Sequence, residues 1–216
     1  MADSQRGFEL LGKGDADGLR RLLEEDPGAA EARDASGVSL LMHSLYRGRR
    51  DLAELIADKK KELDIFEAAG LGRLERLEAC ARDAVAVNSH STDGFTALHF
   101  ACFFGQGDAA RLLIEKGALV DDVASNPTKV MPLHSAASAR NLEAARLLLE
   151  HGAPVNARQQ GGWAPIHAAA QNGDRAMVEL MLKHGADPRL SNDEGKAPAM
   201  VAREKAHTEI AALLEE

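Results

Sequence analysis

The chain has 216 residues, of which 45% are hydrophobic, 28% charged and 4% aromatic, and its formal net charge is −8. This acidic balance argues against nucleic-acid binding, because a clustered basic face drives binding to phosphates. No apolar run approaches the roughly 18 residues of a membrane-spanning helix, and no signal-type apolar core follows Met1. Two cysteines are too few for a disulfide framework, so we expect a reduced, cytoplasmic protein.

Three weakly similar segments come first, at residues 1–34, 35–63 and 64–91. Each carries a large apolar residue at an equivalent position, namely Phe8, Met42 and Phe66. The step from Phe8 to Met42 is 34 residues, but the step from Met42 to Phe66 is only 24. Because each unit of a repeat array is held only by its neighbours, we expect the junction near residues 57–66 to lack a turn and to be weak or bent.

Three segments with a clearer motif follow, at residues 92–124, 125–158 and 159–191. Each contains a motif histidine, followed at a fixed distance by a leucine-rich stretch and a Gly-Ala pair; these histidines are His99, His134 and His167. In the first of the three, Gly105 separates two apolar patterns that predict helices at about 97–104 and 108–116. A last segment, 192–216, has Met200 at the histidine position and the charged outer face of a capping unit.

Self-similarity with a period near 33 residues predicts a solenoid, and the motif at residues 96–101, Thr-Ala-Leu-His-Phe-Ala, resembles the T-P-L-H-x-A signature of the ankyrin-repeat family. No copy matches the signature in full, and only Ser39 and Thr96 keep a hydroxyl at its first position. The resemblance covers nearly the whole chain. It implies a single all-α domain, an ankyrin-repeat solenoid of about seven stacked helix-turn-helix units with short β-turn fingers, whose first and last units are caps. The high content of Ala, Arg, Asp and Gly is similar to that of bacterial members, and Met1 with a capping last unit fits a complete protein.

The regular row of histidines does not predict a metal site. Metal ligands must converge on one ion, whereas equivalent positions of stacked repeats lie roughly 10 Å apart, the distance between packed helices. We therefore interpret the motif histidines as structural. Cys80 and Cys102 fall at apolar helix positions, and no basic neighbour marks either as reactive. We predict no catalytic residue, no metal and no cofactor, and we do not expect an enzyme.

The distribution of the few aromatic residues is the main functional signal. The resemblance implies that five of them face outward, on the finger tips and on the concave groove that contacts partners in the ankyrin family. Aromatic residues dominate the binding energy of protein interfaces, and clustered exposed ones mark recognition sites. The predicted partner-binding residues are Tyr46, Phe95, Phe103, Phe104, Val130, Gln160, Trp163, Gln171 and Asn172.

We therefore predict a monomeric module that binds an unknown protein partner through the concave face and finger tips of repeats four to six. Neither nucleic acid nor a membrane is expected as a partner. Two alternatives remain open. One is an enzyme or small-ligand sensor that uses the irregular junction near residues 57–66 as a cleft. The other is a structural array that associates with itself.

Overall fold

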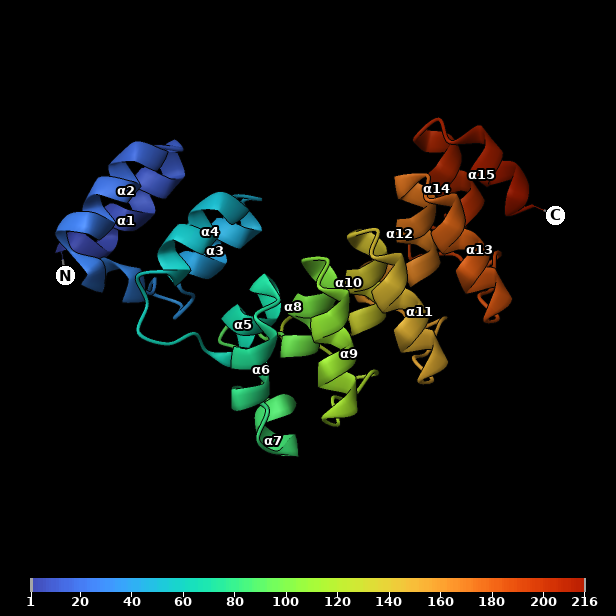
Figure 1. The fold of residues 1–216 in the computed structure, drawn as a ribbon. Helices are drawn as coiled ribbons and strands as arrows, with labels where there is room; N and C mark the ends of the chain where they lie inside the picture. The colour runs from blue at the N-terminus through green and yellow to red at the C-terminus, as the bar shows by residue number, and fades with distance from the viewer. Residues whose placement is uncertain (1, 216) are drawn as a thin grey trace.

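The computed structural model describes residues 2–215, and its helices stack in consecutive pairs along one direction (Figure 1). Met1 and Glu216, the outermost residues of the predicted first and last repeats, lie outside this range. The pairs are α1 (Ala2–Lys13) with α2 (Ala16–Glu25), α3 (Leu40–Tyr46) with α4 (Arg50–Ala57), α5 (Ile65–Leu71) with α6 (Leu74–Cys80), α8 (Ala97–Phe103) with α9 (Gly107–Glu115), α10 (Pro132–Ser138) with α11 (Leu142–Glu150), α12 (Pro165–Asn172) with α13 (Arg175–Lys183), and α14 (Pro198–Glu204) with α15 (Thr208–Leu213).

Three short elements complete the described part of the chain: α7 (Ala84–Val87) and the 3₁₀ helices η1 (Pro27–Glu31) and η2 (Gln160–Gly162). Between residues 2 and 215 the only β-structure is two isolated bridges, Arg33 with Ser39 and His90 with Thr96. The predicted all-α class is confirmed.

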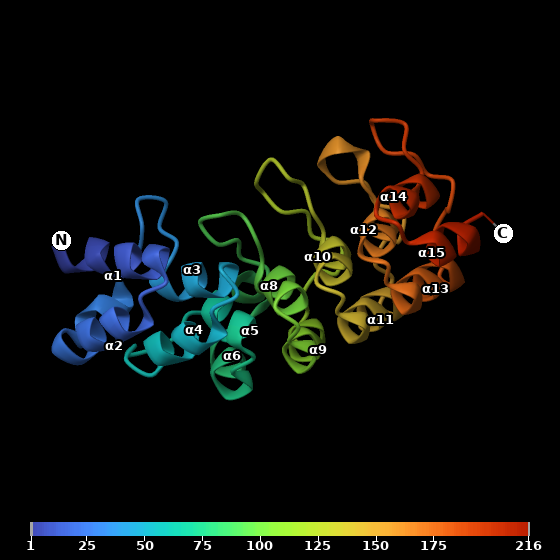
Figure 2. The same ribbon diagram turned by 90° about the horizontal axis from the view of Figure 1, so that it is seen from above.

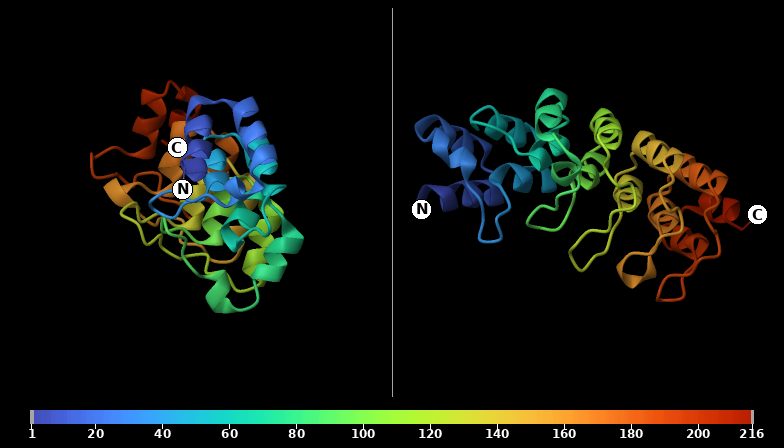
Figure 3. Two further views of the ribbon diagram at one scale, coloured as in Figure 1. Left: turned by 90° about the vertical axis from the view of Figure 1, so that its left-hand side faces the viewer. Right: turned by 90° about the horizontal axis from the view of Figure 1, so that it is seen from below.

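The first helix of each pair belongs to an inner row and the second to an outer row. Along the inner row, α5, α8, α10, α12 and α14 pack one on the next, and α6, α9, α11 and α13 do the same along the outer row. The N-terminal and C-terminal helices lie at opposite ends of the resulting array (Figure 1). The loops that precede the inner helices project from one edge, and we call them fingers two, four, five, six and seven (residues 34–38, 91–95, 125–130, 159–163 and 192–196; Figures 2 and 3).

Local sequence explains where the helices begin. The hydroxyl of Thr96 and the side-chain carbonyl of Asn141 accept backbone N–H groups in the first turns of α8 and α11, which satisfies donors that have no partner within the helix. Pro132 and Pro165 occupy the first positions of α10 and α12, where the missing N–H of proline costs nothing.

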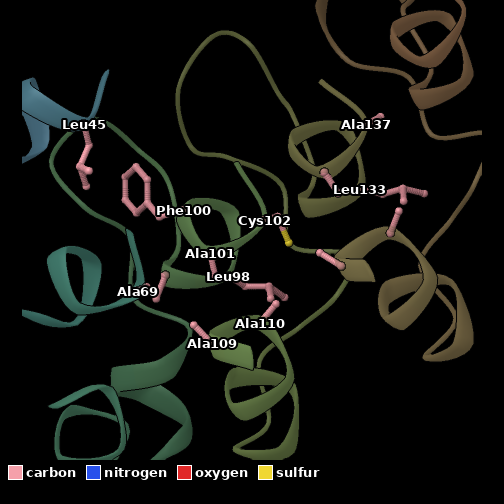
Figure 4. Packing of buried hydrophobic residues seen from close by; sticks show 14 of the residues in the cluster. Leu45, Ala69, Leu98, Phe100, Ala101, Cys102, Ala109, Ala110, Leu133 and Ala137 are labelled. Carbon is pink, nitrogen blue, oxygen red and sulfur yellow. The ribbon is translucent and has the colours of Figure 1, made fainter. Parts of the chain in front are cut away.

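The core is continuous and is built from leucine and alanine. Leu98, Leu133 and Leu148 are fully buried. Figure 4 shows Leu98 and Leu133 in this core, with Ala101 and Ala110 beside Leu98. Because alanine adds little side-chain volume, neighbouring helices approach closely. A chain with few aromatic residues therefore still forms a dense core.

The three motif histidines connect each repeat to the next finger. Nδ1 of His99 accepts the backbone N–H of Thr96 at 3.2 Å, so Nε2 carries the proton and donates to the Val130 carbonyl at 3.1 Å. His134 Nε2 donates in the same way to the carbonyls of Ala157 and Trp163, at 3.1 and 3.2 Å. His167 Nε2 likewise lies 3.2 Å from a carbonyl of finger seven. Burial lowers the pKa of His99 and of His134 to about 4, so both are neutral. Their structural interpretation is confirmed.

The row of fingers is interrupted where the sequence step is short. Successive fingers four to seven are joined by one backbone hydrogen bond each, from Ser125 to Gly94, from Gln160 to Thr128 and from Asp193 to Gly161, all at 2.9 Å. The segment 58–64 between α4 and α5 forms no such turn, as predicted. Finger two instead reaches finger four directly: a methyl group on Gly37 would lie 3.0 Å from Thr92 Cγ2.

The predicted register of the third repeat is wrong by one residue at the start of α5. Asp64 caps this helix, and Glu67 completes a capping box at the third helical position, which His99 occupies in α8. Glu67, not Phe66, therefore replaces the motif histidine. A carboxylate can accept the N–H of the capping residue as the imidazole does, but the apolar pattern alone pointed to phenylalanine.

Candidate functional site

Aromatic side chains from three parts of the chain form one cluster on the inner row. Tyr46 ends α3, Phe95 belongs to finger four, Phe100 and Phe103 lie on α8, and Phe104 caps the C-terminal end of α8. The ring centroids of Phe103 and Phe104 are 5.2 Å apart, those of Tyr46 and Phe104 are 5.8 Å apart, and those of Phe95 and Phe100 are 5.7 Å apart. These distances are those of favourable aromatic pairs. Tyr46 and Phe103 remain 40% and 45% exposed.

Gly70 explains how Tyr46 of the second repeat reaches the fourth. It lies in α5, the inner helix between them, and a methyl group on Gly70 would approach Leu45 Cδ1 to 2.9 Å and Phe104 Cδ2 to 3.2 Å. Because Gly70 has no side chain, Leu45 and Phe104 can both pack against α5 at this position. Leu45 and Phe100 both belong to the buried core drawn in Figure 4.

The cluster forms part of a hollow between the fingers and the inner helices, with a cavity volume of about 190 Å³. We call it the aromatic groove. Finger residues form one wall and residues of α8 and α10 form the other. It is lined by Tyr46, Phe95, His99, Phe100, Phe103, Thr128, Val130, His134, Ser135 and Ser138.

A second hollow, with a volume of about 320 Å³, continues from the aromatic groove toward the sixth repeat. Both hollows share His134 and Ser138 in their lining. We call the second the amide hollow, since three glutamines take part in it. Its residues are His134, Ser138, Gln159, Gln160, Trp163, Ala164, Ala168 and Gln171.

Seven of the nine predicted site residues line these hollows. Tyr46, Phe95, Phe103 and Val130 line the aromatic groove; Gln160, Trp163 and Gln171 line the amide hollow.

Two predicted residues have a different role in the structure. Phe104 is half-buried and stacks on Phe100 with an angle of 12° between the rings. The amide of Asn172 donates to the carbonyls of Ala137 and Ser138, both at 3.2 Å, and so ties α12 to α10. Neither residue lines either hollow: Phe104 packs on the groove residue Phe100, and Asn172 fixes α12 to α10.

Sequence reasoning missed Phe100, Thr128 and Ser135 as lining residues. Phe100 is buried but forms part of the groove floor. Ser135 and Ser138 lie one residue and about one helical turn after His134, a spacing that places them along one side of α10. That spacing was the available signal, whereas Thr128 depends on the shape of finger five.

The two hollows are electrically neutral along their lining. No Asp, Glu, Lys or Arg is among the residues that line either of them, within the part of the chain that the structure describes. Asp93, which is not among the lining residues, accepts hydrogen bonds from the hydroxyls of Tyr46 and Ser91. Partial burial and the bond to Asp93 raise the pKa of Tyr46, so its phenol stays protonated.

A third, more polar hollow lies at the irregular junction, with a volume of about 630 Å³ and a lining from residues 57, 60–63 and 72–76. Its arginines already have partners: Arg73 binds Glu54, and Arg76 donates to the Leu63 carbonyl at 2.7 Å and to Glu62 at 2.9 Å. Among residues 2–215, no group of three or more His, Cys, Asp or Glu side chains is placed to hold a metal ion. In the same range, no helix has the length and apolar character needed to cross a membrane.

Comparison with known proteins gives a consistent family assignment. A sequence model described as ankyrin repeats, in three copies, matches residues 65–159 and 154–216, which is more than half of the chain. The human BCL-6 corepressor-like protein 1 is 38% identical over 110 residues, 50% of this chain and 6% of that protein. The mouse B-cell lymphoma 3 protein homolog is 36% identical over 88 residues, 40% of this chain and 19% of that protein.

A palmitoyltransferase, Hip14 of Drosophila melanogaster, is 33% identical over 99 residues, 46% of this chain and 15% of that protein. The chain thus spans less than a fifth of the length of each of these three relatives. The shared segment occurs in proteins with different names. The likeness therefore concerns the repeat module and not the remainder of each relative.

Proposed function

Because the chain belongs to the ankyrin-repeat family, whose repeats are protein-binding modules, we propose that it binds a protein partner through the aromatic groove and the adjoining amide hollow. The proposed site extends from Tyr46 in repeat two to Gln171 in repeat six. It is broader than the set of repeats four to six that the sequence suggested. We also propose that the protein is a monomer and has no enzymatic role.

The observation that carries this proposal is the cluster of exposed aromatic rings on a rigid support. Tyr46 and Phe103 remain accessible to solvent, whereas Phe100 beneath them is buried. Exposed apolar clusters of this kind mark interaction sites, and tyrosine is among the residues that contribute most to interface affinity. Stacked helices hold the rings in place, so little conformational entropy is lost on binding.

The test compares three forms of the protein: wild type, Phe103→Asp and the matched control Leu119→Asp. Leu119 is also apolar and 53% exposed, but it lines neither hollow. All three are immobilised and exposed to a lysate of the cells that express the chain. A captured protein is then purified, and its affinity for each form is measured by calorimetry.

We expect a partner that binds wild type and Leu119→Asp equally and binds Phe103→Asp at least about tenfold more weakly, the usual loss when an aromatic anchor is removed. Circular dichroism should show the same helical content in all three forms. Equal affinity for wild type and Phe103→Asp would refute the proposed site. Phe104 is unsuitable for this test because its substitution would also disturb the stack on Phe100.

The junction hollow is the second candidate site, favoured by its volume of about 630 Å³. Under this alternative, native mass spectrometry of the purified protein should reveal a bound small molecule. Self-association is the third possibility, and light scattering decides it. A dimer of wild type that dissociates in Phe103→Asp would make a second copy the partner at the aromatic groove.

A further inference from the structure

The chemistry of the two hollows restricts what part of a partner they can hold. We propose that together they bind an uncharged, extended peptide segment, with one large apolar side chain in the aromatic groove and the adjoining backbone against the glutamines of the amide hollow. This inference rests on the proposed function and specifies the occupant of the same site.

The aromatic groove has the size and surface for one side chain. A cavity of about 150 Å³ lined by apolar residues already accommodates benzene, and the groove has about 190 Å³. Its lining includes the rings of Tyr46, Phe95 and Phe103 and the side chain of Val130. A Leu, Ile, Met or Phe side chain would exchange water for these surfaces, whereas a whole helical turn would not fit inside the groove.

The neutral lining selects against charge. Burial of a charged group without a partner of opposite sign is costly, and no acidic or basic side chain lines either hollow within the described residues. His99 and His134 do not supply a charge either, because each holds its single ring proton in a hydrogen bond to a backbone carbonyl. Phosphorylated, acidic and basic segments are therefore disfavoured.

The amide hollow offers groups that match a peptide backbone. A glutamine side chain has two donors and one acceptor oxygen, as needed for the C=O and N–H groups of an extended chain. In the described part of the chain, the side-chain amides of Gln159, Gln160 and Gln171 make no intramolecular hydrogen bond. They remain available to a partner, unlike the amide of Asn172, which is already bonded to α10.

The arrangement also sets the order of the two contacts along the segment. The apolar groove lies toward repeat four and the amide hollow toward repeat six, with His134 and Ser138 in between. In an extended peptide, alternate side chains point to opposite sides. One apolar residue would therefore enter the groove while its neighbours face away, and the backbone of the next residues would cross the amides.

The test uses a phage-displayed library of random linear peptides, selected separately on wild type, on Phe103→Asp and on Gln171→Lys. Gln171 is exposed at the end of α12, so the lysine tests chemistry without disturbing the core. Selected peptides are synthesised with a fluorescent label, and their affinities are measured by anisotropy at low and high salt.

Wild type should select a Leu, Ile, Met or Phe flanked on one side by uncharged residues, with Asp, Glu, Lys and Arg depleted there. The affinity of these peptides should change little with salt, because no ion pair is formed, and should fall about tenfold or more in Phe103→Asp. Gln171→Lys should instead select an Asp or Glu at a fixed distance from the apolar residue, since its new cation faces the same segment.

Three outcomes would overturn the inference. Selected peptides that are charged and bind with a strong salt dependence, yet are lost with Phe103→Asp, would refute the chemistry and leave the aromatic groove as the site. Failure to select any peptide, while a purified partner still depends on Phe103, would refute a linear segment and favour a folded surface. Peptides that bind Phe103→Asp as tightly as wild type would place binding elsewhere and refute the proposed function as well.

Discussion

The ammonium group of Lys60 lies 3.4 Å from Oε1 of Glu67, and both side chains are almost completely buried, at 2% and 0% exposure. The same ammonium group is 2.8 Å from Oε2 of Glu31. At 3.4 Å, the positive charge of Lys60 compensates the buried carboxylate of Glu67, but Oε1 accepts no close hydrogen bond. This pair lies at the junction where the finger is missing. Ion pairs of Lys60 therefore connect the chain there, whereas backbone hydrogen bonds join fingers four to seven.

Substitution of Lys60 by Met should destabilise the protein by about 3 kcal/mol at neutral pH, because it leaves Glu67 buried without its counter-charge. Burial first, and then nearby Asp64, raise the pKa of Glu67. A carboxyl whose folded pKa is raised stabilises fully below its ordinary value of 4.5 and loses that contribution as the pH rises through the folded value. The difference in unfolding free energy between wild type and Lys60→Met should therefore become smaller when the pH is lowered from 7 to 5. Urea unfolding at the two pH values measures it.

Lys59→Met provides the control, since Lys59 is adjacent but exposed. Its effect should stay within about 0.5 kcal/mol, as for ordinary surface positions. Equal stabilities of Lys60→Met and Lys59→Met would show that the buried pair does not stabilise the junction.

The buried histidines should make the protein less stable in mild acid. The folded pKa of His134 is depressed from 6.5 to about 4 by burial, so its contribution is complete above pH 6.5 and declines as the pH falls toward 4. The resulting loss of unfolding free energy between pH 7 and pH 5 is about 2 kcal/mol. His99 has the same depression and adds to the effect. Urea unfolding of wild type at pH 7 and pH 5 measures the sum.

His134→Asn should cost about 1–3 kcal/mol at pH 7, since the carbonyls of Ala157 and Trp163 lose their donor. It should also reduce the difference between pH 7 and pH 5 by about 2 kcal/mol. His151→Asn provides the surface control, because His151 is exposed and donates to the Leu147 carbonyl at the end of α11. A wild-type stability that is the same at both pH values would contradict neutral, desolvated imidazoles.

Gly70→Ala should destabilise the protein and Gly12→Ala should stabilise it, although both glycines lie in helices. Nothing lies within 4 Å of a methyl group on Gly12, so alanine there should stabilise by about 0.5–1 kcal/mol through its helix propensity. At Gly70 the methyl group would overlap Leu45 and crowd Phe104, and overpacking costs about 1–3 kcal/mol. Thermal unfolding of the two variants measures this, and stabilisation by both would mean that the contact across α5 is loose.

Gly94→Ala should be more harmful than Gly117→Ala, although the backbone φ angles of the two glycines are similar, +88° and +90°. Left-handed backbone costs either alanine roughly 1–2 kcal/mol. At Gly94 the methyl group would also lie 2.8 Å from the backbone nitrogen of Asn126, whereas nothing lies within 4 Å at Gly117. The separation of fingers four and five should add about 1 kcal/mol, because the bond from Ser125 to Gly94 is lost.

Hydrogen exchange gives the direct measurement for Gly94→Ala. The amide of Ser125 should exchange faster in this variant and should be unchanged in Gly117→Ala. Unchanged protection of Ser125 in both variants would contradict a coupled row of fingers.

The sequence by itself determined the repeat family, the helices and the structural role of His99, His134 and His167. Repeat arrays are predictable in this way because each unit contacts only its neighbours, so a local pattern carries most of the fold. The same logic located the missing finger, since 24 residues cannot contain a full unit. It failed at Glu67, where capping chemistry and not apolarity sets the register of α5.

Only the tertiary structure decided which outward-facing residues meet. Tyr46 joins the cluster of Phe100 and Phe104 because Gly70 leaves space across an intervening helix, a contact between repeats that are not adjacent in sequence. The neutral groove, its continuity with the amide hollow and the buried Lys60–Glu67 pair arise likewise from side chains that belong to different repeats. Their distances depend on how helices of unequal spacing stack, and a periodic pattern contains no measure of that stacking.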